Sequence, residues 1–260
     1  MKKRPDLDQE HDFFSTKRHE NIAILSFKEN LLIRSTDLEA KAALMEYLDL
    51  VSESDSIGVV VIIGSPEKTG RDEYLEFYRQ LLEWKLDRYA VLRMCHAVDQ
   101  FILKIVDLNK MVVHADGGRI IPMFLNVSLA CDYRIVADNT VFQNPCIELG
   151  LVPKGGGAFF ISKMLGIRKA SEILLSGEDI TAQEAMKLGI VDKVVPLDEL
   201  RETAIKIAQD FAQTPSLTLS GLKKLLNYSR KDLKDYLDLE NEVLIRIVES
   251  SDFRQKLGEQ

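Results

Sequence analysis

The stretch from Lys110 to Gly166 constrains the fold of this chain more than any other segment. An apolar run at Met111–Ala115 ends close to two glycines, and a second apolar run occupies Tyr133–Ala137. Short apolar runs that end at turn residues are typical of buried β-strands. Three glycines then lead into Ala158–Leu165, whose apolar spacing predicts a helix. A glycine-rich turn at a helix start leaves backbone N–H groups available to an anion or a polarised oxygen.

The segments before this stretch predict a parallel sheet. Ile57–Gly64 is almost entirely β-branched, which is typical of a strand covered on both faces. Ile22–Phe27 predicts another strand, which we place at a sheet edge, and Asp37–Leu50 between them has the spacing of an amphipathic helix. Strand, helix and strand in this order predict a right-handed crossover. Residues 1–17 are polar, and we expect them to be frayed.

The remaining segments predict helices. Asp72–Leu108 has neither proline nor glycine, so one long helix or two broken ones would fit. Thr181 and Glu184 have the spacing of a capping box. We expect Asp198 to cap a helix that reaches about Ala212, and Pro215 to occupy the first position of the next helix. The last helix carries one stripe, which consists of Leu233, Leu237, Glu240, Leu244 and Ile247.

Composition excludes several classes of protein. The 260 residues, 46% of them apolar, suffice for one sizeable core, and the net charge of −7 without a long basic run disfavours nucleic-acid binding. Cys95, Cys131 and Cys146 lack metal-ligand spacing and indicate reduced, buried thiols. No signal peptide or membrane-spanning run is evident, so we expect a soluble cytoplasmic protein without a metal. The absence of a Gly-x-Gly-x-x-Gly motif disfavours a Rossmann dinucleotide binder.

The order of these pieces resembles the enoyl-CoA hydratase/isomerase (crotonase) superfamily. The family has an Ala-Cys-Asp-x-Arg-Ile strand, a Pro-Glu-x-x-Leu-Gly turn and a Pro-Gly-x-Gly-Gly loop, which correspond here to Ala130–Ile135, Pro145–Gly150 and Pro153–Gly157. The resemblance implies an α/β fold with a spiral core of β-β-α turns, which we assign to residues 1–195. It also implies a C-terminal helical region, residues 196–260, that forms a homotrimer or a dimer of trimers.

The resemblance implies a site for an acyl-CoA thioester and a role in fatty acid metabolism as a lyase or isomerase, with no other cofactor. The family holds the thioester oxygen with two backbone N–H groups. The first is expected in the turn Thr69-Gly70-Arg71-Asp72. The second is expected at Met123, in the block Pro122-Met123-Phe124, where the family has three glycines. Because these side chains occupy space that glycine leaves open, we expect acyl-CoA binding to be weakened but detectable.

The family's two catalytic glutamates are replaced here by Asn126 and Cys146. Hydration by two glutamates is therefore not expected. Glu148 is the nearest carboxylate and could act as a single base, or it could be a solvated or capping residue. His114 and Asp116, two residues apart on a strand, face the same side and could form an alternative base or a structural pair. Cys146 could be a nucleophile, but we favour a buried thiol because no base is evident beside it.

These residues are compatible with two functions. The first is an atypical acyl-CoA enzyme, an isomerase or hydratase that stabilises an enolate. The second is a non-catalytic subunit of the same fold that binds acyl-CoA or supports a partner enzyme. Lys154 could meet a phosphate or carboxylate, although we expect a solvated lysine. Several aromatic residues could line an acyl pocket or belong to the core; they are Tyr74, Phe77, Tyr78, Trp84 and Tyr89.

Overall fold

A seven-stranded sheet forms the centre of the fold in the computed structural model, which describes residues 6–28, 32, 38–66, 68, 70–83 and 88–258. Its strands, in spatial order, are β1 (Gln9–Glu10), β2 (Phe14–His19), β3 (Ile22–Phe27), β4 (Val59–Ile63), β5 (Met111–Asp116), β7 (Tyr133–Ala137) and β10 (Lys193–Val195). The strands from β3 to β10 are parallel, and β1 and β2 are antiparallel additions. The predicted α/β class with a parallel sheet is confirmed.

A second sheet of three strands, β6 (Arg119–Ile120), β8 (Val141–Phe142) and β9 (Ile180–Thr181), lies beside the first. The helices are α2 (Leu38–Glu53), α3 (Arg71–Glu83), α4 (Arg88–Asp107), α5 (Pro122–Ala130), α6 (Cys146–Leu149), α7 (Gly157–Leu165), α8 (Ile167–Ser176), α9 (Ala182–Leu188), α10 (Leu200–Ala212), α11 (Ser216–Asn227), α12 (Leu233–Val248) and α13 (Ser251–Gly258). Within the predicted stretch Asp72–Leu108, the described residues up to Asp107 thus belong to two helices, α3 and α4.

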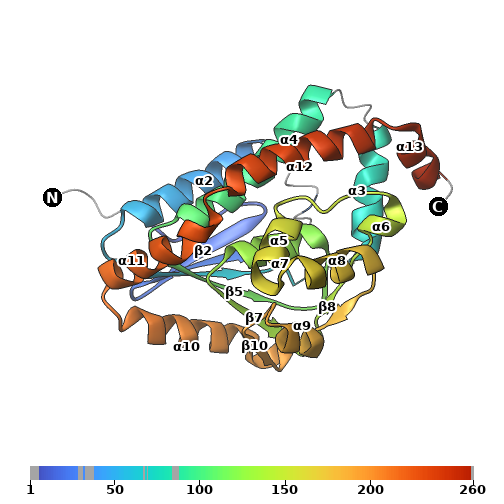
Figure 1. Ribbon diagram of the computed structural model, residues 1–260. Coiled ribbons are helices and arrows are strands. Elements are labelled where there is room, and N and C mark those ends of the chain that lie inside the picture. The colour runs from blue at the N-terminus through green and yellow to red at the C-terminus, as the bar shows by residue number, and fades with distance from the viewer. Residues whose placement is uncertain are drawn as a thin grey trace.

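Helices cover both faces of the large sheet. Helix α10 lies along one face, and α2, α4 and α12 lie over the other (Figure 1). In β4, Val59 and Val61 pack toward α10, whereas Val60 and Ile62 join the larger core on the opposite face. Burial on both faces explains the continuous β-branched run, as predicted.

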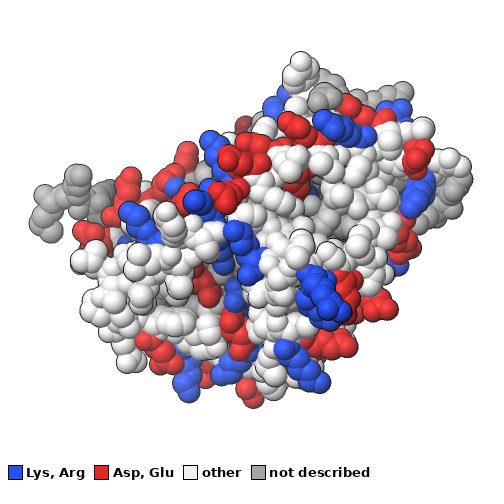
Figure 2. Space-filling model, in the orientation of Figure 1, with Lys and Arg blue, Asp and Glu red and all other residues white. Residues whose placement is uncertain are grey.

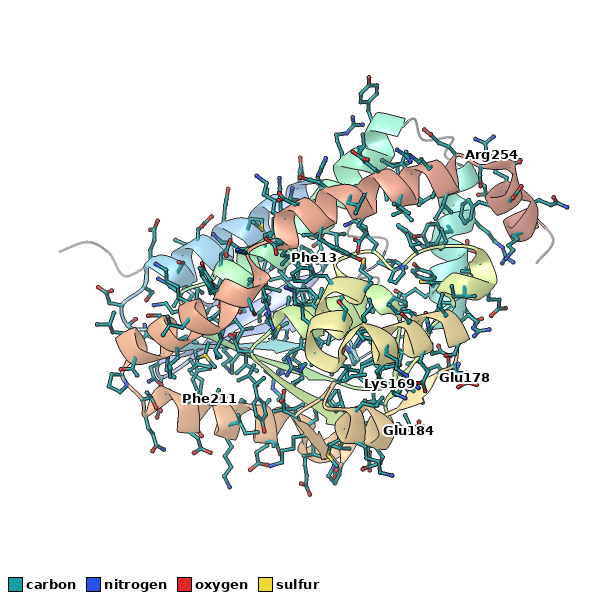
Figure 3. All side chains as sticks on the ribbon, in the orientation of Figure 1. Phe13, Lys169, Glu178, Glu184, Phe211 and Arg254 are labelled. Atoms are coloured by element: carbon teal, nitrogen blue, oxygen red, sulfur yellow. The ribbon has the colours of Figure 1, made fainter. Side chains whose placement is uncertain are left out.

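The N-terminal part of the described chain is ordered, so the expectation of a frayed segment is wrong for residues 6–17. Strands β1 and β2 form there, and Leu7, Phe13 and Phe14 are buried. Figure 3 shows Phe13 in the interior of the fold. The addition of β1 and β2 also makes β3 an internal strand, not an edge strand. Three apolar anchors in a polar segment are enough to hold the hairpin against the core.

The helix starts agree only in part with the sequence. The capping box is confirmed, because Glu184 N–H donates to Thr181 Oγ1 at 3.3 Å and Thr181 N–H donates to Glu184 Oε2 at 2.9 Å. Asp198 does not cap α10, since a short 3₁₀-helix, Leu197–Glu199, precedes it. Pro215 precedes the first helical residue of α11 and does not occupy it.

Charged side chains of both signs are spread over the face that Figure 2 shows. In the described part of the chain, no helix has both the length and the apolar character needed to span a bilayer.

Candidate active site

An apolar pocket lies at the carboxyl ends of β4 and β5, the edge where parallel sheets usually bind ligands. We call it the Asp116 pocket. It contains about 740 Å³ of empty space, including the part open to solvent. Its walls come from the residue before β2, from β3, α2, α4 and α5, and from β5 and the loop after β4; they are Phe13, Phe27, Lys41, Leu44, Gly64, Lys68, Ala97, Val98, Phe101, His114, Asp116, Met123, Phe124 and Val127.

A buried ion pair faces this pocket. Asp116 forms an ion pair with Lys68 Nζ, and both side chains are only 3% exposed. Asp116 Oδ1 also accepts the N–H of Gly117 at 2.8 Å. Gly64 leaves room for the carboxylate, because a Cβ at this position would collide with it. Lys68 Nζ in turn lies 5.6 Å from the ring centroid of Phe124.

His114 lies beside this ion pair on the same side of β5, as its spacing from Asp116 predicts. Burial lowers the pKa of His114 to about 4. The negative charge of Asp116 opposes this effect, and the positive charges of Lys68 and Arg134 add to it. The imidazole is therefore neutral near pH 7. Its Nδ1 atom has no hydrogen-bond partner among the described residues. The structure thus brings His114 and Asp116 together in one pocket.

A second apolar pocket, which we call the Tyr74 pocket, borders the first. Met123 and Val98 line both pockets, so the Met123 side chain stands between them. The other lining residues are Leu32, Tyr74, Phe77, Tyr78, Leu81, Val91, Met94, Cys95, Lys154, Leu244 and Val248. Of the five aromatic candidates, three line this pocket, Tyr89 is 71% exposed, and Trp84 lies outside the described residues.

In the turn predicted to hold the first oxyanion donor, one N–H group is engaged by the chain itself. Arg71 N–H donates to Gln143 Oε1 at 2.9 Å. Gly70, just before it, has φ +68°, a left-handed conformation that favours glycine. Asp72 is exposed in the first turn of α3, and Thr69 lies outside the described residues. Nothing in the local sequence indicates that Gln143 reaches this turn.

The second predicted donor is open. Met123 is the second residue of α5, where a backbone N–H has no carbonyl of its own helix to bond. Within the described part of the chain, this N–H forms no hydrogen bond. The Met123 side chain is half-buried, whereas Phe124 is buried in the core.

The residues at the family's glutamate positions have structural contacts. Asn126 Nδ2 donates to the carbonyl of Lys154 at 2.7 Å. Cys146 is buried, with Sγ 3.7 Å from Tyr74 Oη, and burial raises the pKa of its thiol to about 11. The thiol is therefore neutral at physiological pH. This agrees with the interpretation of Cys146 as a buried thiol.

Glu148 lies at the surface, which agrees with the alternative of a solvated carboxylate and not with a base inside a pocket. Its side chain is 49% exposed and forms an ion pair with Arg71. It lines neither the Asp116 pocket nor the Tyr74 pocket. The reason is helical geometry: Cys146 and Glu148 are two residues apart on α6, and such residues face different sides.

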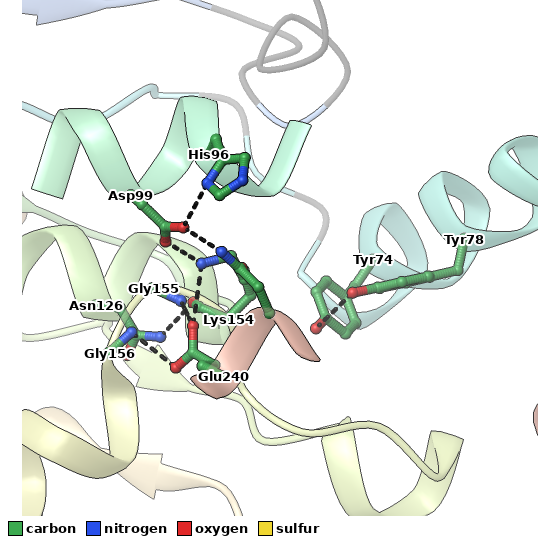
Figure 4. A network of polar contacts seen from close by, with 10 residues as sticks. Tyr74, Tyr78, His96, Asp99, Asn126, Lys154, Gly155, Gly156 and Glu240 are labelled. Atoms are coloured by element: carbon green, nitrogen blue, oxygen red, sulfur yellow. Dashed lines mark hydrogen bonds and ion pairs between the residues drawn. The ribbon is translucent and has the colours of Figure 1, made fainter. Parts of the chain in front are cut away.

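The glycine-rich turn before α7 binds an anion from the same chain. Glu240, on α12, accepts Gly155 N–H at 2.6 Å and Gly156 N–H at 3.0 Å (Figure 4). Lys154 is 7% exposed and pairs with Asp99 and Glu240, so the expectation of a solvated lysine is wrong. Burial raises the pKa of Glu240, although Lys154 opposes this effect. The sequence signal for this contact is a glutamate, Glu240, within the otherwise apolar stripe of α12.

The spiral of parallel strands, the glycine-rich turn and the pocket at the strand ends define a protein of the crotonase fold class. The profile described as enoyl-CoA hydratase/isomerase matches residues 17–259. This chain belongs to the enoyl-CoA hydratase/isomerase family.

Comparisons with individual proteins agree with this membership. A "Probable enoyl-CoA hydratase, mitochondrial" of Dictyostelium discoideum is 35% identical over 122 residues, 47% of this chain and 44% of that protein. A carnitinyl-CoA dehydratase of Salmonella typhi is 33% identical over 124 residues, 48% of each chain. The matched segments thus span about half the length of these relatives. The crystal structure of enoyl-CoA hydratase from Bacillus halodurans has a TM-score of 0.80 at 20% identity, covering 96% of this chain and 100% of that one.

Proposed function

We propose that this protein binds an acyl-CoA thioester and moves a proton from one carbon of the acyl group to another, which shifts a double bond. The names of the two sequence relatives both describe enzymes of CoA thioesters. The observation that carries the proposal is the buried Asp116 carboxylate in the pocket that Met123 borders. Met123 N–H is the donor for the thioester oxygen, and one such donor typically contributes about 10²–10³ in rate.

The proton transfer needs one carboxylate. Asp116 takes a proton from the carbon next to the thioester carbonyl, and the electron pair of the broken C–H bond moves onto the thioester oxygen, giving an enolate. When the carbonyl re-forms, the double bond shifts, and a more distant carbon takes the proton back from Asp116. Lys68 pairs with the carboxylate and holds it in place.

Asp116 is favoured over Glu148 because of its surroundings. Asp116 is buried and faces a pocket, whereas Glu148 is half exposed and paired with Arg71 at the surface. Hydration would need a second acid–base group to activate water, and each such role contributes about 10²–10⁴. Asn126 and Cys146 cannot supply it, and the lowered pKa of His114, about 4, makes its imidazole a weak base, so hydration of a simple enoyl-CoA is expected to be slow or absent.

Asp116→Asn is predicted to lower the isomerisation rate at least about 10²-fold, because the amide cannot take up the proton. The product is measured by mass spectrometry with 3-enoyl-CoA substrates of several chain lengths. Glu148→Gln is the matched control, a neutralised surface carboxylate that should retain activity within a few-fold. A large loss in Glu148→Gln with an active Asp116→Asn would contradict the assignment. Efficient hydration of crotonyl-CoA by the wild type would contradict the one-base mechanism.

A second candidate function is a non-catalytic subunit that binds acyl-CoA. The occupation of Arg71 N–H by Gln143 favours it, because one of the two oxyanion donors is engaged. Calorimetric titration with acyl-CoAs distinguishes the two candidates: binding without turnover of any unsaturated acyl-CoA supports the non-catalytic subunit.

A further inference from the structure

The Tyr74 pocket contains two phenol groups whose hydrogen bonds are poor. The hydroxyl oxygens of Tyr74 and Tyr78 are 3.4 Å apart, and Tyr74 Oη is 3.7 Å from Cys146 Sγ. Good O–H···O bonds are about 2.5–3.0 Å long, and a thiol sulfur is a weak acceptor. These hydroxyls form no other hydrogen bond among the described residues. A buried O–H group without a good acceptor is destabilising, so both groups favour an additional acceptor.

The two hydroxyls are directed to the same place. Tyr74 and Tyr78 are one turn apart on α3, both line the pocket, and Figure 4 shows their hydroxyl oxygens next to each other. The rest of the wall is mostly apolar and includes Phe77, Met94 and Leu244. An apolar pocket with two convergent donors has the form of a specific small-molecule site.

The charges around the pocket favour a neutral acceptor over an anion. Burial raises the pKa of both tyrosines, and it raises the pKa of Cys95 to about 11, so these groups remain protonated at physiological pH. Lys154, the cation in the pocket wall, is already paired with Asp99 and Glu240. An anionic group would therefore meet two nearby carboxylates and no cation left unpaired in the described wall.

We propose that the Tyr74 pocket receives an acyl group with a neutral oxygen substituent, a hydroxyl, ether or keto oxygen away from the thioester, that accepts hydrogen bonds from Tyr74 and Tyr78. This inference rests on the proposed function and names its substrate class. Met123 connects the proposed active site with the oxygen-binding site, because it borders both the Asp116 pocket and the Tyr74 pocket. Its unbranched side chain can rearrange to let an acyl chain pass from one pocket to the other.

The test is calorimetric titration with hexanoyl-CoA, with hexanoyl-CoA hydroxylated at carbon 3, 4, 5 or 6, and with adipoyl-CoA, which ends in a carboxylate. One hydroxylated form is expected to bind about tenfold more tightly than hexanoyl-CoA, because a good buried hydrogen bond contributes about this much. Adipoyl-CoA is expected to bind more weakly than hexanoyl-CoA. In Tyr74→Phe and Tyr78→Phe, the hydroxylated form should bind no more tightly than hexanoyl-CoA, while the affinity for hexanoyl-CoA itself is kept. Tyr47→Phe is the control, since Tyr47 is a buried tyrosine of α2 that does not line the pocket.

Equal binding of all neutral forms by the wild type would overturn this inference and leave the proposed function intact. If no acyl-CoA binds, the proposed function fails, and a CoA-free pair of probes still tests the pocket. The wild type should then bind p-cresol more tightly than toluene by ligand-observed NMR, and Tyr78→Phe should lose the difference. Equal binding of the two probes, or a difference that persists in both tyrosine variants, would refute the oxygen site.

Discussion

At the scale of single residues, side-chain contacts decide which predicted groups are available for chemistry. Met123 and Phe124 both replace glycines of the resembling family, but they differ in the structure. Met123 separates two pockets, whereas Phe124 is 4% exposed in the core. Glycine at position 123 would therefore open the site, and glycine at position 124 would cost about 3–5 kcal/mol of stability. Gln143 also decides availability, because it engages the N–H of Arg71 in the turn predicted to hold the first oxyanion donor.

Gln143→Ala is predicted to tighten acyl-CoA binding several-fold, because it frees Arg71 N–H for the thioester oxygen. Calorimetry with a saturated acyl-CoA measures the effect. Asn144→Ala is the neighbouring control, since its side chain donates to the carbonyl of Ile173 and does not contact the turn. Unchanged or weaker binding in Gln143→Ala, with the fold intact, would show that Arg71 N–H does not hold the ligand.

At the scale of elements, one buried cluster attaches α12 to the rest of the molecule. Glu240 bonds the turn before α7, and Asn241 Nδ2 donates to Asp99, on α4, at 2.7 Å. Glu240→Ala leaves the N–H groups of Gly155 and Gly156 without their acceptor and leaves Lys154 with Asp99 alone. We predict a loss of about 3–5 kcal/mol in the free energy of unfolding, measured with urea. Glu242→Ala, on the exposed side of α12, should change it by less than about 0.5 kcal/mol. Similar values for the two variants would contradict the role of Glu240.

The same cluster predicts a pH dependence. Burial raises the pKa of Glu240 above its ordinary 4.5, so the folded state takes up a proton at a higher pH than the unfolded state. The stabilisation linked to this proton is complete below pH 4.5 and is lost as the pH rises through the folded-state pKa. The stability of the wild type relative to Glu240→Gln should therefore increase as the pH falls from 7 toward 4.5. A decrease over this range would mean that Lys154 and the glycine N–H groups determine the pKa instead.

At the scale of the whole molecule, α11 and the short 3₁₀-helix Tyr228–Arg230 after it present exposed apolar side chains that support the proposed trimer. Leu217, Leu225, Leu226 and Tyr228 are 85%, 75%, 73% and 72% exposed. Large exposed apolar surface on a protein often marks a site of association. Light scattering is predicted to give a mass near three times the chain's 29.5 kDa, or a multiple of it. The Leu225→Glu/Leu226→Glu variant should dissociate, and the Lys224→Glu control should not. A monomeric wild type at micromolar concentration would contradict the trimer.

The sequence by itself determined the features that depend on neighbouring residues. It predicted Tyr133–Ala137 as a strand and Thr181 with Glu184 as a capping box, because periodicity and local hydrogen bonds set both. It also placed His114 and Asp116 on one side of a strand. Only the tertiary structure decided which groups meet across the chain. Gln143 reaches Arg71 from 72 residues away, and Glu240 reaches Gly155 from 85 residues away. Such contacts depend on how helices pack, which the pattern of nearby residues does not contain.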